Sequence, residues 1–480
     1  MKTSFLTLLA LLLASLSTLD AAESPPVAQP NIILIMPDDV GYGDYSCLGN
    51  PVMKTPAVDA FWKQSVRFTD FHVSPTCAPT RSALLSGRHE FKNGVTHTIN
   101  ERERLSLKTI TFPQVLKSAG YTTGVFGKWH LGDEAAYQPD QRGFDEVYIH
   151  GGGGIGQTYP GSCGDAPGNQ YFNPALLHNG KFEKTTGYCT DLFFNQAIKW
   201  MDGARQNKAP FLAFISLNVA HEPLQVPEEN YQHYAGKVPE KVAKFYGMIE
   251  TLDHNFGILL DKLKTWGIEE NTLVIFIGSD NGGTAGVPLF NAGMRGSKVT
   301  PYQGGTRVPC FWRWPAKLNG GRDIPALTAH IDIFPTLIEI LGLPPSAELA
   351  KQIEGRSLLP LLNNASTEWA DRFLVTHVGR WSHGKVAEAK FAHCSIRDSR
   401  FTLVNNKELY DLQADPGESK NVIDVHTEEV AKLRTAYDQW WNDVQPLLVN
   451  ENAVGPKLNP FKERYWQQFG GGPKTEANQK

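Results

Sequence analysis

The sequence predicts an α/β protein in which helices flank a large, mostly parallel central sheet, followed by a small antiparallel sheet with a helix. Between residues 31 and 341, short apolar runs rich in β-branched and aromatic residues alternate with longer amphipathic segments. This alternation is typical of a parallel sheet that helices cover on both faces. Beyond residue 366 the segments become shorter and alternate in polarity, which indicates a small antiparallel sheet.

Four apolar runs in the first region are the clearest strands, and four segments with helical periodicity accompany them. The strands are expected at 31–36, 122–126, 211–217 and 272–277, and the helices at 112–119, 190–201, 241–266 and 331–341. In the second region, strands are expected at 372–377, 390–397 and 400–404, and a helix at 427–444.

These patterns divide the chain into four parts. Residues 1–22 are expected to be a signal peptide, 23–365 the main α/β domain, 366–450 a small C-terminal α+β subdomain and 451–480 a tail. The tail is rich in Gly, Pro, Asn and Lys, a composition that predicts poor order.

The amino terminus has the features of a secretory signal. Lys2 precedes an apolar run over residues 5–16, and small residues follow at Ala21 and Ala22. A membrane span needs roughly 20 apolar residues, so this shorter run, followed by a Ser-Pro-Pro sequence, favours cleavage over an anchor. We therefore expect an exported protein, periplasmic or secreted, with no stable membrane span.

Export would permit disulfides, and the chain has six cysteines. If one of them is reserved for chemistry, an odd number remains, so at least one thiol stays free or pairs unusually. Cys163 and Cys189 bracket a stretch rich in Gly and Asn, and they could either form a disulfide or remain two buried thiols. No cysteine pair has the spacing of a zinc site.

The charge balance restricts the class of partner. The 46 Lys and Arg residues nearly match the 50 Asp and Glu residues, for a formal net charge of -4. This balance argues against nucleic acid as a partner. A small anionic ligand remains compatible with it, because a local cluster of cations recognises such a ligand irrespective of the total charge.

Polar residues follow each of the four clearest strands. They are Asp38 and Asp39, Lys128 and His130, residues 218–221, and Asp280 with Asn281. Ligands of an open parallel sheet bind outside the carboxyl ends of its strands, so these residues are expected to meet in one crevice. Taken singly, an Asp after a strand is often a helix cap and a His is often structural. Their joint occurrence after four strands favours a site.

Residues 77–88, with the sequence CAPTRSALLSGR, resemble the signature of the type I sulfatases of the alkaline-phosphatase superfamily. The resemblance covers most of the chain in the order of the family's motifs. It includes NIILIMPDDVGYGD at 31–44, the block at 120–132 ending in GKWHLG, GSDNG at 278–282, Lys298, and residues 409–418.

The resemblance implies that a maturation enzyme recognises the Cys-x-Pro-x-Arg sequence and converts Cys77 to formylglycine. One hydroxyl of the hydrated aldehyde would attack sulfur, and the other would expel sulfate from the covalent intermediate. The family also places one calcium ion beneath this residue, so the modified Cys77 counts among the metal ligands. The other implied ligands are Asp38, Asp39, Asp280 and Asn281. Hard oxygen donors of this kind suit Ca²⁺ or Mg²⁺ and disfavour zinc.

The same resemblance assigns roles to the remaining polar residues. Arg81 would hold the hydrate, and His130 would accept its proton when sulfate is expelled. Lys128 and Lys298 would bind sulfate oxygens and stabilise the transition state. His221 would contact the ester and protonate the leaving alcohol.

These observations predict a sulfatase that acts on the sulfate monoester of an extracellular carbohydrate or of an aryl alcohol. The alternatives are a phosphonate or phosphate ester hydrolase of the same superfamily and a non-catalytic sulfoglycan-binding protein. The stretch 150–189 could shape the substrate pocket or be a surface insertion. A second group could contact a sugar or merely belong to the folded surface: His377, Arg380, Trp381 and His383.

Overall fold

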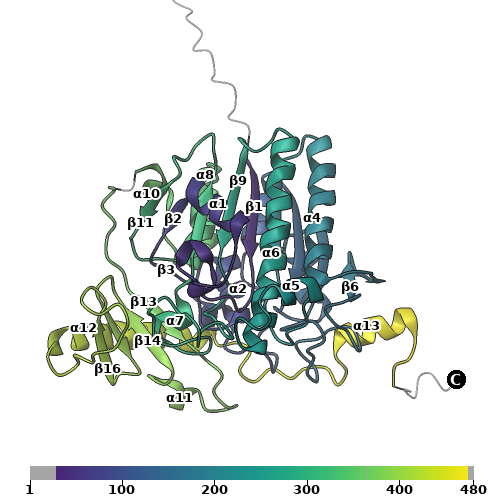
Figure 1. Ribbon diagram of the computed structural model, residues 1–480. Coiled ribbons are helices and arrows are strands. Elements are labelled where there is room, and N and C mark those ends of the chain that lie inside the picture. The colour runs from purple at the N-terminus through teal and green to yellow at the C-terminus, as the bar shows by residue number, and fades with distance from the viewer. Residues whose placement is uncertain (1–28, 365, 474–480) are drawn as a thin grey trace, which may run out of the picture.

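The computed structural model describes residues 29–364 and 366–473 (Figure 1). A ten-stranded sheet forms its centre, with the strand order β11-β2-β10-β9-β1-β8-β4-β5-β6-β7. The strands are β1 Asn31–Met36, β2 Val66–Phe68, β4 Thr122–Lys128, β5 Glu146–His150, β6 Ala175–His178, β7 Lys181–Lys184, β8 Phe211–Ser216, β9 Thr272–Ile277, β10 Cys310–Arg313 and β11 Arg322–Ile324.

The middle of the sheet is parallel and its edges are mixed. Strands β9, β1, β8, β4 and β5 pair in parallel. On one side β10 pairs antiparallel to both β9 and β2, and on the other β6 and β7 continue the sheet antiparallel to β5. The predicted mostly parallel sheet is therefore confirmed, with the predicted four strands as its centre.

Helices cover both faces of the sheet, as the two-sided burial of β1 requires. Ile33 and Ile35 face a core with α1, α4 and α6, which Figure 1 shows in front of the sheet, whereas Ile32 and Leu34 face a core with α2, α3 and α8. The bounds of these helices are α1 Pro56–Gln64, α2 Cys77–Ser86, α3 Phe112–Ser118, α4 Cys189–Gln206, α6 Glu240–Thr265 and α8 Ile333–Ile340.

The C-terminal part forms the predicted small antiparallel sheet, with a helix packed on it. Its strands run in the order β13-β14-β15-β16, and helix α12 occupies the predicted residues. This part has a core of its own, to which Phe91 of the main domain contributes. The bounds are β13 Leu374–His377, β14 Cys394–Arg397, β15 Phe401–Val404, β16 Glu408–Asp411 and α12 Thr427–Val444.

The prediction of a poorly ordered tail is wrong for residues 451–473. Helix α13 (Pro460–Phe469) begins at the N-cap Asn459, whose side chain accepts hydrogen bonds from two backbone amides of the first turn. Phe461 is buried and its ring lies 6.1 Å from that of Phe182 in β7. Packing of these aromatic rings fixes the tail against the sheet edge.

Two further predictions concern the cysteines and the amino terminus. All six cysteines lie within the described residues and each is a free thiol, so Cys163 and Cys189 do not form a disulfide. The signal peptide predicted at 1–22 lies outside the described residues. Among the helices that the structure describes, none is long and apolar enough to cross a bilayer.

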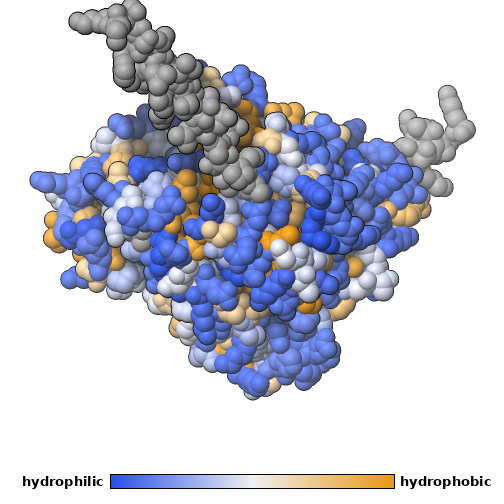
Figure 2. Space-filling view, turned by 90° about the horizontal axis from the view of Figure 1, so that it is seen from above, coloured by the Kyte–Doolittle hydropathy of each residue, from blue (hydrophilic) through white to orange (hydrophobic). Residues whose placement is uncertain are grey.

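Figure 2 looks down on the face at which β1 begins, and hydrophilic residues cover most of it. The carboxyl ends of the parallel strands lie at the opposite face, next to the C-terminal sheet (Figure 1). The predicted site residues lie at those carboxyl ends.

Candidate active site

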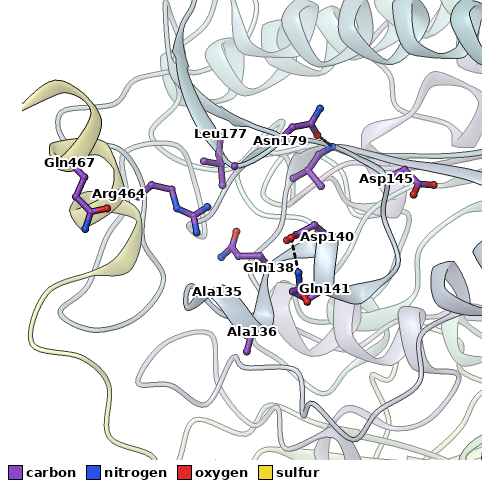
Figure 3. A pocket seen from close by; sticks show the side chains of 12 residues that line it. Ala135, Ala136, Gln138, Asp140, Gln141, Asp145, Leu177, Asn179, Arg464 and Gln467 are labelled. Atoms are coloured by element: carbon purple, nitrogen blue, oxygen red, sulfur yellow. Dashed lines mark hydrogen bonds between the residues drawn. The ribbon is translucent and has the colours of Figure 1, made fainter.

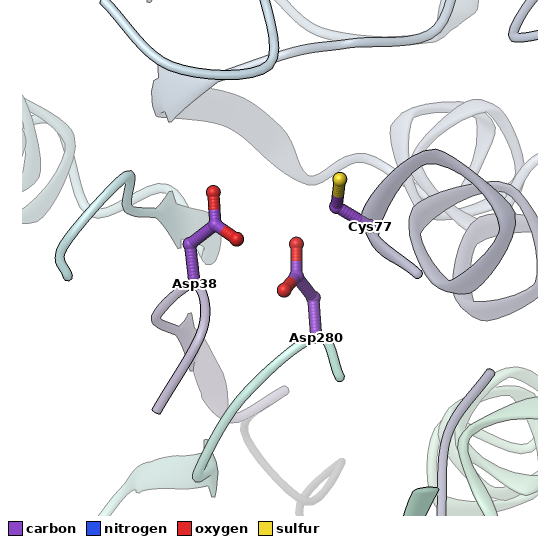
Figure 4. Close-up of side chains that lie close together, drawn as sticks. All are labelled: Asp38, Cys77 and Asp280. Carbon is purple, nitrogen blue, oxygen red and sulfur yellow. The ribbon is translucent and has the colours of Figure 1, made fainter. Parts of the chain in front are cut away.

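The candidate active site has three residues from separate elements at its centre. Asp38 follows β1, Asp280 follows β9, and Cys77 is the first residue of α2. Their side chains point toward one another (Figure 4), and their ligand atoms all lie within 4.8 Å of one another. Residues that are separated by 203 positions, 77 to 280, thus meet where the parallel strands end, as the sheet topology predicts.

Helix α2 fixes the position of Cys77 because all ten of its residues are buried. Leu84 and Leu85 belong to the core behind the sheet, which anchors the helix along its length. The sequence CAPTRSALLS was not predicted as a helix, since its apolar positions lack a clear period. The position of Cys77 at the helix amino terminus also favours negative charge there, because free backbone amides point from that end.

Arg81 lies one helical turn after Cys77, on the same side of α2. Its guanidinium binds the Asp280 carboxylate with Nε to Oδ2 at 2.8 Å and Nη2 to Oδ2 at 2.7 Å. It also donates to the backbone carbonyl of Lys128 at 3.1 Å and to the hydroxyl of Ser216. Four elements are thereby connected through one buried side chain, so its orientation is fixed before any ligand binds.

Two lysines pair with the two acids that follow β1. Lys128 Nζ lies 2.5 Å from Asp38 Oδ2 and 4.0 Å from Asp280 Oδ2, with all three side chains fully buried. Lys298 Nζ lies 2.5 Å from Asp39 Oδ1. Burial alone would lower the pKa of both lysines, but the neighbouring acids raise it overall, so both ammonium groups stay charged.

Three side-chain oxygens of this cluster are buried and have no hydrogen-bond partner among the described residues. They are Oδ1 of Asp38, Oδ1 of Asp280 and Oδ1 of Asn281. Burial and the nearby Asp280 raise the pKa of Asp38 well above its usual value. Unpaired buried acceptors are costly, and a hard cation would satisfy them and favour the ionised form of Asp38. The residues present therefore fit the calcium site that the resemblance implies.

Asp39 and Asn281 complete this set of oxygen donors. The Asn281 amide donates to Asp39 Oδ1 at 2.9 Å, which leaves its own carbonyl oxygen free. Burial alone would raise the pKa of Asp39, but Lys298 and then His221 outweigh burial and lower it. Asp39 is therefore ionised at neutral pH and can serve as a ligand.

Hydrogen bonds set which nitrogen of each histidine is left free. His130 Nε2 donates to the Thr98 carbonyl at 2.8 Å, so its buried and unpartnered Nδ1 is the free nitrogen. His221 Nδ1 donates to the Glu222 carbonyl at 2.6 Å, and its Nε2 lies 4.0 Å from Asp39 Oδ2. Burial lowers the pKa of His221 to about 4 and that of His130 well below its usual value, so both rings are neutral at pH 7.

The stretch 150–189 packs against both histidines and is not a loose surface insertion. A β-carbon on Gly153 would lie 3.4 Å from His130 Cε1, and one on Gly154 would lie 2.8 Å from His221 Nδ1. Gly153 N also donates to the thiol of Cys163 at 3.1 Å. Glycine is required at 154 in particular, because only a backbone without a side chain can approach the imidazole so closely.

The structure thus brings together every residue for which the sequence predicted a role. They are Asp38, Asp39, Cys77, Arg81, Lys128, His130, His221, Asp280, Asn281 and Lys298. Sequence reasoning missed Thr98 and Ser216, which orient His130 and Arg81. Thr98 stands in a loop without any motif, whereas Ser216 is the penultimate residue of the strand predicted at 211–217 and could have been considered with its neighbours.

A separate hollow of about 640 Å³ opens at the other edge of the sheet, between β6, α13 and residues 135–145 (Figure 3). Amide side chains and two acids line it, and none of the site residues named above reaches it. The lining includes Gln138, Asp140, Gln141, Asp145, Asn179, Arg464 and Gln467.

Comparison with known protein families identifies the family to which this chain belongs. The family profile described as "Sulfatase" matches residues 30–343, about two thirds of the chain. The chain belongs to the sulfatase family. A second profile, described as "N-sulphoglucosamine sulphohydrolase, C-terminal", matches residues 297–442 of this sulfatase. The enzyme class of this chain, sulfuric ester hydrolase, and its alkaline-phosphatase-like fold agree with the predictions from the sequence.

Individual relatives support the same family. Arylsulfatase G of Mus musculus is 31% identical over 379 residues, which cover 70% of this sulfatase and 69% of the relative. Arylsulfatase A of Homo sapiens is 30% identical over 445 residues, covering 82% and 83%. The crystal structure of Ps i-CgsB in complex with k-i-k-neocarrahexaose is 25% identical, with a TM-score of 0.77 over 92% of this chain and 97% of that one.

Proposed function

We propose that this sulfatase hydrolyses a sulfate monoester of a sulfated glycan, with formylglycine made from Cys77 as nucleophile and one calcium ion as cofactor. The observation that carries the proposal is the arrangement around Cys77. Its side chain faces two carboxylates whose buried free oxygens, with that of Asn281, form a cation site of hard donors. The family's chemistry needs a cation beside a modified cysteine.

When present, the calcium ion would supply a concentrated positive charge and the formylglycine hydrate would supply the attacking hydroxyl. Asp38, Asp39, Asp280 and Asn281 would hold the ion, together with the modified side chain of residue 77. The chain's own residues account for the rest of the chemistry.

The cationic side chains bind and orient the ester. Lys128 and Lys298 contact sulfate oxygens and stabilise the charge that develops on them. Arg81 keeps the side chain of residue 77 in place, because its guanidinium is already fixed by Asp280 and by two strand ends. Such preorganised charge needs no rearrangement during the reaction, which is the main source of electrostatic catalysis.

The two histidines move protons at defined atoms. His130 accepts a proton at Nδ1, since its Nε2 hydrogen is held by the Thr98 carbonyl. His221 delivers a proton from Nε2 to the leaving alcohol. The pKa of His221, about 4 in the free protein, means that it is neutral until an anionic ester arrives. The negative charge of the sulfate then favours the protonated ring, so the acid forms where the substrate is bound.

A glycan is the proposed substrate class, and an aryl sulfate is the simpler alternative. Support for the glycan comes from the relative Ps i-CgsB, whose structure contains k-i-k-neocarrahexaose. The predicted signal peptide over 1–22 supports it too, because an exported enzyme meets polymeric substrates outside the cell.

The test compares protein made with and without the formylglycine-generating enzyme. We expect the peptide that contains Cys77 to lose mass, as conversion of CH₂SH to CHO requires, only in the presence of that enzyme. Only the converted protein should release sulfate from aryl and glycan esters, and EGTA should abolish this activity until calcium is restored. Full activity of protein with an unmodified thiol would contradict the proposal.

The phosphate ester alternative is tested with the same aryl alcohol carrying sulfate or phosphate. We expect sulfate release to have the higher kcat/KM. A large preference for phosphate would overturn the assignment of the ester while leaving the cation site intact.

A further inference from the structure

The loop over residues 96–104 connects the catalytic histidine to the C-terminal subdomain. The carbonyl of Thr98 accepts the hydrogen bond from His130 Nε2 at 2.8 Å, and its hydroxyl accepts one from Arg380 Nη2 at 3.0 Å. Thr98 is therefore the single residue between the His130 imidazole and the Arg380 guanidinium, although Arg380 lies 282 positions after Thr98 in the chain. Through Thr98, Arg380 lies one residue away from His130, and we refer to Arg380 with the loop 96–104 as the rim.

Arg380 has no acidic partner among the described residues. Its Nε hydrogen is buried and unpartnered, and the hydroxyl of Thr98 is its side-chain contact. The neighbouring Arg102 shows the usual arrangement for a buried arginine, since it pairs with Glu451 at 3.1 Å and stacks 4.8 Å from the Trp381 ring. A guanidinium that keeps an unpartnered donor one residue away from His130 is suited to bind an anion of the ligand.

Two histidines stand near Arg380, and His97 adds a neutral hydrogen-bond donor to the rim. Nδ1 of His97 accepts hydrogen bonds from the amides of Thr98 and Ile99, so its ring hydrogen is on Nε2, where it can donate to a ligand. Burial, and then the charges of Arg380, Arg102 and His383, lower the pKa of His97 to about 3. His383 is exposed, and its ring bonds the Glu451 carbonyl at 3.2 Å.

The backbone around Arg380 is strained in a way that places its side chain on Thr98. Arg380 has a φ of 61°, in the left-handed region that a bulky residue seldom adopts. Its amide donates to the Thr96 carbonyl at 2.9 Å. The preceding Gly379 also has a positive φ, and a β-carbon there would lie 2.1 Å from the same carbonyl oxygen. Strain of this kind persists where the surrounding structure enforces it and is concentrated at ligand-binding positions.

We propose that Arg380, with His97 and His383, forms a second anion subsite next to the sulfate-cleaving centre. It would bind a further sulfate or carboxylate of the same glycan, so the substrate class is a sugar chain with at least two anionic groups. This inference rests on the proposed function, because it places the ester sulfate at Lys128 and Lys298. His377 and Trp381, by contrast, are buried and support the loop from within.

The test uses the full-length converted enzyme and three matched oligosaccharides. All carry the same cleavable sulfate, and the second position holds a sulfate, a carboxylate or a neutral hydroxyl. The measured quantity is the ratio of kcat/KM for each doubly anionic substrate to that for the neutral one. In Arg380→Gln we expect this ratio to fall by about 10- to 100-fold, the usual effect of a charge-assisted hydrogen bond. If the ratio falls for only one of the two doubly anionic substrates, its second group, sulfate or carboxylate, is the anion that the subsite prefers.

Two further variants make the test specific. Arg400→Gln removes an exposed arginine of the same subdomain that pairs with Asp411, and we expect the wild-type ratio. Arg380→Lys keeps the charge without the planar fork, so we expect a ratio between those of wild type and Arg380→Gln. If Arg380→Gln does not fold, the ratio measured in Arg380→Lys tests the subsite in its place.

The outcomes separate the two proposals. A wild-type ratio in both Arg380 variants would overturn the subsite and leave the sulfatase function standing. An absence of sulfate release from all three oligosaccharides and from aryl sulfate would instead overturn the proposed function, and the subsite with it.

Discussion

The floor and the rim of the active site use cations in opposite ways. In the floor, Lys128, Arg81 and Lys298 are each bound to a carboxylate at 2.5 to 2.8 Å. In the rim, Arg380 has no such partner in the part of the chain that the structure describes. Paired cations are fixed in advance and suit a group present in every substrate, whereas an unpaired cation obtains its counter-charge from the ligand. Under the proposed function, this difference would separate residues that act in catalysis from residues that select the substrate.

The largest effect is expected in the floor, from Cys77→Ala. This variant lacks the proposed nucleophile, so we expect sulfate ester hydrolysis to fall by roughly 10⁴-fold or more, measured as kcat with an aryl sulfate. Cys47→Ser removes a half-buried thiol outside the site and should keep wild-type kcat. Appreciable turnover by Cys77→Ala would mean that another group attacks sulfur.

The next effect concerns the cation site of the floor. Asp38→Asn removes a carboxylate that faces both Lys128 and the predicted cation, so we expect kcat to fall by roughly 10²- to 10³-fold. The calcium concentration needed for half-maximal activity should increase as well. Asp140→Asn changes an exposed acid at the separate hollow of Figure 3 and should alter neither quantity. An unchanged calcium requirement in Asp38→Asn would contradict the metal assignment.

The support of the rim is tested by Glu451→Gln. Glu451 pairs with buried Arg102 and accepts a hydrogen bond from Trp381 Nε1 at 2.6 Å. Loss of the Glu451 charge leaves Arg102 without a counter-ion. We therefore expect the free energy of unfolding, measured by denaturant titration, to fall by about 4 kcal/mol. Glu388→Gln breaks only an exposed pair with Lys385 and should leave the midpoint within error. Equal midpoints for the two variants would show that the buried pair contributes nothing.

The smallest effect is a pH dependence beneath the rim. Burial lowers the pKa of His377 to about 4, while an unfolded histidine titrates near 6.5. Between these values the unfolded chain binds more protons, so the free energy of unfolding decreases as the pH falls through this window, by up to about 3 kcal/mol. His377→Gln should therefore show a shallower loss of stability from pH 7 to pH 4.5.

The control for this prediction is a histidine with the opposite shift. Glu146, and also Glu183, raise the pKa of His178 above its usual value. Its contribution to stability is present at low pH and is lost as the pH rises through its folded pKa. His178→Gln should therefore steepen the loss of stability toward low pH, where His377→Gln makes it shallower. Parallel stability curves for the two variants would contradict at least one of the two shifts.

The floor could be predicted from the sequence because each of its residues adjoins a strong local pattern. Apolar runs of buried residues precede Asp38 and Asp280, and both Lys128 and Cys77 stand in dense motifs. The roles of these residues remain predictions until the variants are measured. The short edge strands β2, β10 and β11 have only three or four residues, too few for a periodic signal, and were missed.

The rim could not be predicted in the same way. Thr98 and Arg380 are joined only by tertiary packing, and the sequence gives no local sign that they meet. Trp381 and Arg380 are adjacent and were considered together, yet Trp381 is buried in the C-terminal core whereas Arg380 contacts Thr98 of the loop that holds His130. Helix α13 was missed for a different reason. Its Asn459-Pro460 start is a readable cap followed by Pro at the first position, but the Gly-rich composition around it concealed the signal.

The contact between α13 and β7 has a consequence for the solubility of the whole enzyme. Strand β7 ends the ten-stranded sheet, and the edge of a sheet can pair with a strand of another molecule. The side-chain amide of Gln468 donates to the Phe182 carbonyl at 2.7 Å and accepts from the Phe182 amide at 2.8 Å. One glutamine thus imitates the backbone of a neighbouring strand, so the end of the chain protects the sheet from self-association.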